Sequence, residues 1–95
     1  MKHIVPLPGF ERDIKKFQHE KKERLKNTLD TFNRFVTTGE KPFGFRFKKI
    51  NKNKYEFRVD IRLRVVTRLE GDTFYLVKAG DHNEIKRYLR KFRHK

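Results

Sequence analysis

The sequence contains no cysteine and no tryptophan, and it lacks any long run of hydrophobic residues. Without cysteine, both a disulfide framework and a thiolate metal site are excluded, which fits a reducing compartment. Without a long apolar run, we expect neither a signal peptide nor a membrane span. We therefore expect a cytoplasmic protein that does not enter a membrane.

Hydrophobic residues make up only 35% of the chain and charged residues 40%, proportions that approach those of disordered proteins. Ten phenylalanines, an aromatic content of 14% and a regular apolar spacing argue instead for a folded core. Because a second core would need roughly 50 more residues, we expect residues 1–95 to form a single domain.

Acidic residues are also scarce, and the formal net charge is +14. The excess is concentrated in residues 41–69, where ten basic residues face two acidic ones, whereas residues 1–40 and 70–95 each carry only +3. Such a charge attracts nucleic acid, anionic membranes or acidic proteins. The middle third is therefore expected to carry the binding surface.

Apolar residues recur at helical spacing in the first 40 residues, at Phe10, Ile14 and Phe17 and again from Leu25 to Val36. A polar stretch, residues 18–24, separates the two sets. This pattern predicts a helical hairpin, or one bent helix, that ends near Gly39.

From residue 42 the apolar period changes to two, which predicts strands over residues 43–48, 55–69 and 73–77. The middle one is too long for a single strand, so we expect a reversal near Asp60. An odd-numbered loop centred there keeps one face apolar, and it places Phe57 opposite Leu63 and Arg58 opposite Arg62. Like charges that face each other in this way are favourable only with an anion between them.

Asp81 followed by Glu84 is typical of a helix start. It predicts a C-terminal helix whose buried stripe is Ile85, Leu89 and Phe92. The expected fold is α+β. It comprises a short N-terminal strand, a helical hairpin, an antiparallel sheet of about four strands, and the C-terminal helix.

Three segments, residues 55–59, 63–66 and 77–85, resemble the RelE/ParE superfamily of toxins from toxin–antitoxin pairs. Members of that superfamily carry a paired-strand motif of the form LR-V and a final strand that ends in a Gly-His/Lys-His/Arg-x-Glu turn. The chain departs from the pattern in two places, the reversal and the last motif. Asp60 and Ile61 stand where the family has a glycine at the reversal, and Lys86 stands where a tyrosine is common.

The resemblance implies one of two activities. RelE-like members are ribosome-dependent endoribonucleases that cut mRNA during translation, whereas ParE-like members inhibit DNA gyrase and have no nuclease site. A catalytically inactive relative that only binds nucleic acid is a third interpretation. In each of the first two cases the implied partner is an acidic antitoxin protein, and in the RelE-like case the ribosome and mRNA are partners as well.

Metal-free RNA cleavage requires a base for the 2′-hydroxyl, cations for the developing charge on phosphate, and an acid for the leaving oxygen. His82 suits the acid/base role because imidazole titrates near neutral pH. Arg58 and Arg64 match family positions that hold phosphate, and a guanidinium suits this task. The plainer alternative is that His82 helps to cap its helix and that the arginines only keep a strand face soluble.

Four further residues are candidate RNA contacts: Lys48, Lys49, Arg62 and Lys86. His3, His19 and His94 share no ligand spacing with His82, so we expect no metal site, and the reaction needs no cofactor. The RelE-like endoribonuclease is therefore the favoured hypothesis, because gyrase inhibition does not require a histidine beside a basic face.

Overall fold

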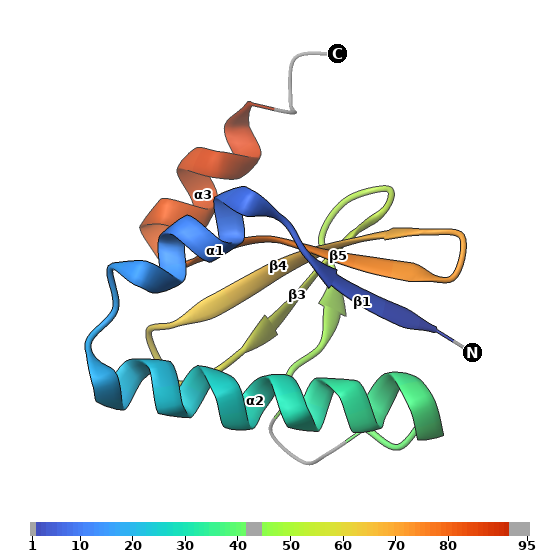
Figure 1. The fold of residues 1–95 in the computed structure, drawn as a ribbon. Coiled ribbons are helices and arrows are strands. Elements are labelled where there is room, and N and C mark those ends of the chain that lie inside the picture. Colours follow the sequence, from blue (N-terminus) through green and yellow to red (C-terminus); the bar gives the residue numbers. More distant parts are fainter. Residues whose placement is uncertain (1, 42–44, 92–95) are drawn as a thin grey trace.

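The computed structural model describes residues 2–41 and 45–91, which form three helices and five strands (Figure 1). In chain order these are β1 (His3–Pro6), α1 (Pro8–Lys15), α2 (His19–Thr38), β2 (Lys48–Lys49), β3 (Lys54–Arg58), β4 (Arg64–Glu70), β5 (Thr73–Gly80) and α3 (His82–Arg90). The predicted α+β order is confirmed. No helix in these ranges is both long and apolar enough to cross a membrane.

The strands form one sheet in the order β1-β5-β4-β3-β2. β2 to β5 make an antiparallel meander, and β1 adds a fifth strand that runs parallel to β5, from His3 opposite Thr73 to Pro6 opposite Leu76. The sheet is therefore mixed rather than purely antiparallel. Proline is tolerated in β1 because this strand lies at the edge of the sheet.

The predicted helical pair is present, but α2 begins at His19, six residues before the first apolar residue of its predicted stripe. Lysine, glutamate and arginine favour helices without contributing to apolar periodicity, so the polar residues 19–24 extend α2 into solvent. Gly39 closes α2 with a left-handed φ of 81°, as the sequence indicates.

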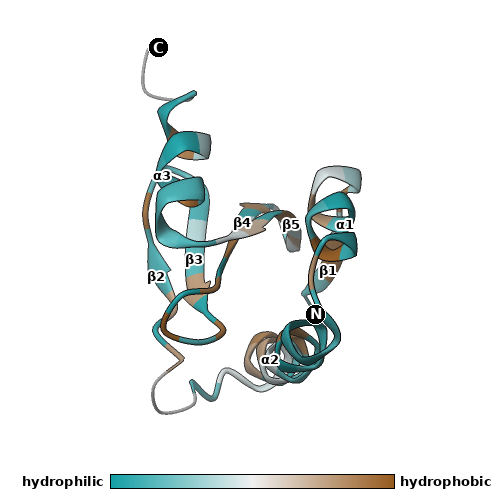
Figure 2. Cartoon of the chain, turned by 90° about the vertical axis from the view of Figure 1, so that its left-hand side faces the viewer, coloured by the Kyte–Doolittle hydropathy of each residue, from teal (hydrophilic) through white to brown (hydrophobic). Residues whose placement is uncertain are grey.

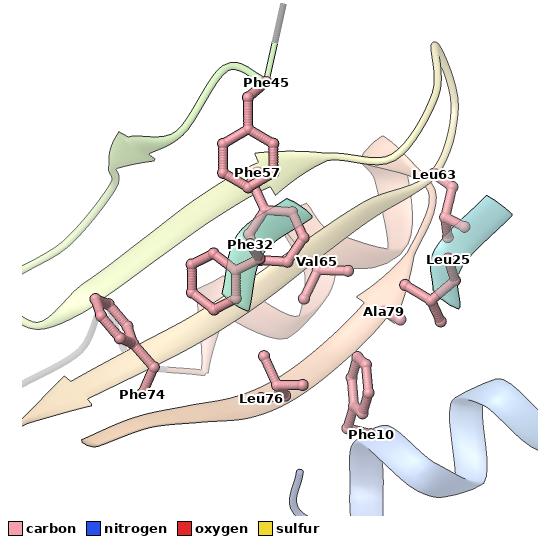
Figure 3. Close-up of a cluster of buried hydrophobic side chains, with 10 residues drawn as sticks. All are labelled: Phe10, Leu25, Phe32, Phe45, Phe57, Leu63, Val65, Phe74, Leu76 and Ala79. Carbon is pink, nitrogen blue, oxygen red and sulfur yellow. The ribbon is translucent and has the colours of Figure 1, made fainter. Parts of the chain in front are cut away.

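Phenylalanine side chains fill the core between α1, α2 and the sheet, as Figure 3 shows. Phe32 of α2 is fully buried, and its ring centroid lies 4.6 Å from that of Phe57 and 5.3 Å from that of Phe74. Burial of each such side chain contributes about 1.5–3 kcal/mol. This cluster holds the odd-numbered residues of β3 and β4 against α2, so the even-numbered residues 58 and 64 point to the opposite face.

α3 covers part of that opposite face, and in Figure 2 it lies on the other side of the sheet from α2. Its Ile85 packs with Val66 of β4 and Val77 of β5, and Leu89 is partly buried against them, whereas Phe92 of the predicted stripe lies outside the described residues. The predicted cap of α3 is also confirmed: Asp81 accepts a hydrogen bond from the Glu84 amide, and the Glu84 carboxylate accepts one from the Asp81 amide. The cap defines where the backbone leaves β5.

Asp13 of α1 fixes the end of β5 from the other side. Its carboxylate accepts hydrogen bonds from the Ala79 amide (3.0 Å) and from Lys78 Nζ (3.3 Å). β5 shifts register between its pairings with Val66 and Thr67, which leaves Val77 as an extra residue. Asp13 therefore anchors the strand just beyond this irregularity and before it enters α3.

The reversal between β3 and β4 has an odd number of residues, as predicted, but it is wider and its centre lies one residue later. Phe57 pairs with Val65 and Arg58 with Arg64, so the predicted pairings with Leu63 and Arg62 are wrong. The physical reason lies in Asp60, whose Oδ1 accepts the amide hydrogens of Arg62 (2.8 Å) and Leu63 (2.7 Å). These bonds hold residues 59–63 as a loop instead of a strand.

The strand predicted over residues 43–48 is shorter than expected, because only Lys48 and Lys49 form β2. Arg46 adopts a left-handed φ of 58°, which interrupts an extended backbone. Phe45 is nevertheless buried, as the alternation predicts, whereas residues 43 and 44 lie outside the described residues.

Candidate active site

A hollow of about 260 Å³ opens on the sheet face opposite α2. The residues that line it come from β2, β3, β4 and the segment before β2, and they are Arg46, Phe47, Lys48, Glu56, Arg58 and Arg64. Four of these side chains are cationic and one is a carboxylate, so the hollow carries a net positive charge. A small cationic hollow of this kind suits a phosphate group.

Strand register explains why these cations meet. Lys48 of β2 lies opposite Glu56 of β3, and Arg58 of β3 lies opposite Arg64 of β4. The two arginines that the sequence predicts as phosphate ligands are therefore direct cross-strand neighbours. Facing like charges destabilise a sheet, and an anion bound between them would remove this repulsion.

Glu56 is the one carboxylate among the lining residues, and its side chain is only 9% exposed. One of its oxygens, Oε2, accepts a hydrogen bond from Arg64 Nη1 at 3.1 Å and lies 4.0 Å from Lys48 Nζ. Arg64 is itself well covered, with 15% of its side chain exposed. The Glu56 carboxylate thus forms a buried ion pair at one side of the hollow.

Arg58 is in a different situation. Among the residues that the structure describes, its side chain has no carboxylate partner, whereas Arg64 has Glu56. The Nε atoms of both arginines are buried without a hydrogen-bond partner. A buried unpaired donor is unfavourable in the absence of an anion. Of the two facing arginines, Arg58 therefore carries the uncompensated charge.

Arg46 lies at the rim of the hollow with its backbone in the left-handed region, at φ 58°. It is the one non-glycine residue with positive φ in the described part of the chain. Such a conformation is unfavourable for a residue with a Cβ atom, and strain of this kind is common at binding sites.

His82 is the first residue of α3, and it is exposed. It follows Gly80, which pairs with Arg64 across β4 and β5, by two residues. The backbone therefore brings His82 to the end of β5 that lies next to Arg64 of β4. Its side chain is not among the residues that line the hollow.

The other candidate RNA contacts are distributed over different surfaces. Lys48 lines the hollow, whereas Lys49 pairs with Tyr55 and by strand alternation points to the opposite face. Arg62 is exposed in the loop between β3 and β4, and Lys86 is exposed on α3, one turn beyond His82. The structure thus brings Lys48, Arg58 and Arg64 together and leaves Lys49, Arg62 and Lys86 outside the hollow.

The sequence-based choice of site residues did not include Arg46 or Glu56. Both lie at even positions, as do Lys48, Arg58 and Arg64, so the alternation already indicated that they share the polar face. Grouping them would have required the register of β2 against β3, which depends on residues 50–53. No three His, Asp or Glu side chains gather into a potential metal site within the described ranges.

No protein-family model and no curated protein matches the chain. Among solved structures, a metal-bound toxin from Helicobacter pylori shares the fold with a TM-score of 0.69 and 20% identity, covering 90% of this chain and 99% of that one. A RelB–RelE antitoxin–toxin complex from Methanococcus jannaschii matches with a TM-score of 0.68 and 19% identity, covering 88% and 96%.

The DinJ–YafQ complex of E. coli is similar in the same way, with a TM-score of 0.68 and 14% identity over 90% of this chain and 98% of that one. Identities this low establish a common fold and not a common activity. The chain therefore has the fold of the RelE, YafQ and YoeB toxins, and the resemblance indicated by its sequence motifs is confirmed at the level of the fold.

Proposed function

We propose that this chain is the toxin of a toxin–antitoxin pair and that it cleaves mRNA on the ribosome without a metal. The observation that carries the proposal is the cross-strand pair Arg58–Arg64, which lines a cationic hollow. Arg64 also pairs with Gly80 of β5, and His82 follows Gly80 by two residues. The toxin fold supports the same conclusion. Solved neighbours with antitoxins, RelB–RelE and DinJ–YafQ, support an antitoxin as partner. The net charge of +14 favours an acidic one.

In the proposed reaction, the 2′-oxygen of a ribose attacks the adjacent phosphorus, so that an O2′–P bond forms and the P–O5′ bond breaks. The products are a 2′,3′-cyclic phosphate and a 5′-hydroxyl. A base must take the proton of the 2′-hydroxyl, and an acid must supply one to the departing 5′-oxygen. His82 is the proposed acid/base residue.

Arg58 and Arg64 would hold the scissile phosphate and stabilise the charge that develops on its oxygens in the transition state. Lys48 and Arg46, on the same face, would contact neighbouring phosphates. Lys86 stands where the resembling family has a tyrosine, and it is one helical turn from His82. It would act as a phosphate ligand rather than as a stacking platform for a base.

A nucleic-acid-binding protein without catalysis is the second candidate. Two observations favour it: His82 is absent from the lining of the hollow, and Lys86 replaces the family tyrosine. The cationic hollow would then hold an RNA phosphate without a proton-transfer group beside it.

The test is a reconstituted translation reaction in which the 5′ ends of mRNA fragments are mapped. We expect the wild-type protein to cut within translated codons and His82→Ala to lose this activity. His19→Ala is the matched control, since His19 is likewise an exposed first residue of a helix, and it should cut normally. RNA binding without any cleavage would support the second candidate, and gyrase-dependent DNA breaks would support a ParE-like activity; either result overturns the nuclease proposal.

A further inference from the structure

We propose that Glu56 is a positioning residue, whose buried carboxylate holds the Arg64 guanidinium in the orientation that binds the scissile phosphate. This inference rests on the proposed function and deepens it, because it assigns a task to the one acidic side chain of the hollow. Glu56 pairs across the sheet with Lys48 and Val66, and it reaches Arg64 diagonally across β3 and β4.

The presence of Glu56 requires an explanation, because a carboxylate repels the phosphate that the hollow would bind. A surface that only attracted RNA would be more effective without it. Burial of a carboxylate is also unfavourable unless a partner compensates for it, and the Glu56 side chain is 9% exposed. Its two cationic neighbours, Arg64 at 3.1 Å and Lys48 at 4.0 Å, provide that compensation.

The arrangement around Arg64 explains what is gained. Arg58 lies directly opposite, so repulsion between the two guanidinium groups would drive Arg64 away from the hollow. The bond from Nη1 to Glu56 opposes this movement. A guanidinium has five N–H donors in a planar fork, so one bond to a carboxylate orients the plane and leaves other donors for phosphate.

Positioning and simple attraction predict opposite effects when the charge of Glu56 is removed. Glu56→Gln makes the hollow more positive, so RNA should bind as tightly as before or more tightly. If Glu56 orients Arg64, cleavage should nevertheless slow, since a neutral amide forms a weaker bond to a guanidinium than a carboxylate does. A purely structural role would weaken binding and cleavage together.

The experiment compares wild type, Glu56→Gln and the control Glu70→Gln in single-turnover cleavage of ribosome-bound mRNA. Glu70 also pairs with an arginine on the same sheet, Arg68 at 2.9 Å, but it is exposed and lies outside the hollow. The maximal rate constant of Glu56→Gln should fall by about tenfold to a hundredfold, which is the penalty for a misplaced catalytic group. Its affinity for a short single-stranded RNA, measured by fluorescence anisotropy, should not fall, and Glu70→Gln should match wild type in both measurements.

A double-mutant cycle with Arg64→Lys shows whether Glu56 acts through Arg64. The loss caused by Glu56→Gln should largely disappear in the Arg64→Lys background, because the guanidinium that it orients is already gone. Losses that simply multiply, an unchanged rate in Glu56→Gln, or a parallel fall in rate and affinity would overturn the positioning role.

The same cycle, measured in RNA affinity, does not depend on cleavage. Arg64→Lys should weaken RNA binding severalfold in the wild-type background and by much less beside Glu56→Gln. If the wild-type protein cuts no mRNA but this coupling is present, the proposed nuclease function fails and the positioning role stands. If the protein cuts mRNA and the coupling is absent, the positioning role fails and the nuclease function stands.

Discussion

Asp60 shapes the reversal between β3 and β4 with its side chain rather than with an unusual backbone conformation. One carboxylate oxygen accepts the amide hydrogens of Arg62 and Leu63, and the other accepts a hydrogen bond from Arg24 Nε at 3.1 Å. The loop contains no residue with positive φ, so it has no need of a glycine. This accounts for the absence of the glycine found at this place in the resembling family.

The pH dependence of stability should reveal the contribution of Asp60. Burial acts to raise the pKa of this carboxyl, but the bonds from Leu63 and Arg62 and the charge of Arg24 outweigh it, so the pKa lies below the ordinary value of 3.8. A carboxyl with a lowered pKa stabilises the fold above its unfolded-state pKa, and this stabilisation is lost as pH falls through the folded-state value. Asp60→Ala should therefore lower the free energy of unfolding by about 1–2 kcal/mol at pH 7.

The difference between wild type and Asp60→Ala should shrink below pH about 4, where the unfolded-state carboxyl becomes protonated. Urea unfolding at pH 7 and at pH 3 provides the measurement. Asp30→Ala, which removes an exposed helical carboxylate, should change stability little at either pH. A constant difference for Asp60→Ala across this range would contradict the assigned cause.

Gly80 is required by the cap of α3. A Cβ atom at this position would lie 2.8 Å from Glu84 Oε1 and 3.1 Å from Glu84 Cβ, so the Glu84 side chain would have to leave the Asp81 amide. Gly80→Ala should lower the free energy of unfolding by roughly 0.5–2 kcal/mol, the usual effect of losing a helix cap. In Gly9→Ala the new Cβ would be 3.8 Å from its nearest neighbours, so denaturant unfolding should show no loss for this control.

At the scale of elements, the β3–β4 pair combines a well-packed face with a repulsive one. Phe57 and Val65 are fully buried neighbours against α2, while the next pair, Arg58 and Arg64, brings two cations together on the other face. The phenylalanine core supplies stability that allows this repulsion to persist. Local destabilisation by like charges of this kind is expected where side chains are arranged to bind a ligand.

Arg58→Thr should therefore stabilise the protein while it removes function. Relief of the repulsion with Arg64 should raise the free energy of unfolding by about 0.2–1 kcal/mol, and cleavage of mRNA should be lost together with a phosphate ligand. Urea unfolding and the translation assay measure the two effects. Added salt should stabilise wild type more than the variant, because it screens the same repulsion; a variant less stable than wild type would show that the pair is not repulsive.

The elements also show what the sequence could predict, the face on which each strand residue lies, and what it could not, the register between strands. Side-chain alternation predicted which residues of β3 and β4 share a face, and Asp81 with Glu84 predicted the start of α3. The partner of Arg58 was wrong by two residues, because register depends on how many residues the loop holds. That number follows from the bonds that Asp60 accepts from Arg62 and Leu63, which the alternation does not reveal.

At the scale of the whole molecule, the net charge of +14 is less informative than the face of the sheet on which each charged side chain lies. Lys48 and Lys49 are adjacent in sequence, yet Lys48 lines the hollow and Lys49 belongs to the opposite face. Loss of either lysine changes the net charge equally. Only the first should matter for RNA held in the hollow.

The salt dependence of RNA binding tests this expectation. Each phosphate contact contributes about −0.7 to the slope of log affinity against log salt for single-stranded nucleic acid. Lys48→Gln should reduce the magnitude of the slope by about that amount, and Lys49→Gln should leave it nearly unchanged. Equal effects of the two substitutions would mean that RNA binds through general charge rather than in the hollow.

The sequence by itself determined the class of elements, the apolar and basic faces of the central strands, and the cap that begins α3. These features follow from the alternation of an extended chain and from contacts within a few residues, so they can be recognised locally. Tertiary structure decided that Arg58 meets Arg64, that Arg46 and Glu56 join them, and that Lys49 and Arg62 do not. Those outcomes depend on strand register and loop length, which are set by distant contacts such as that between Arg24 and Asp60 and by the packing of the phenylalanine core against α2.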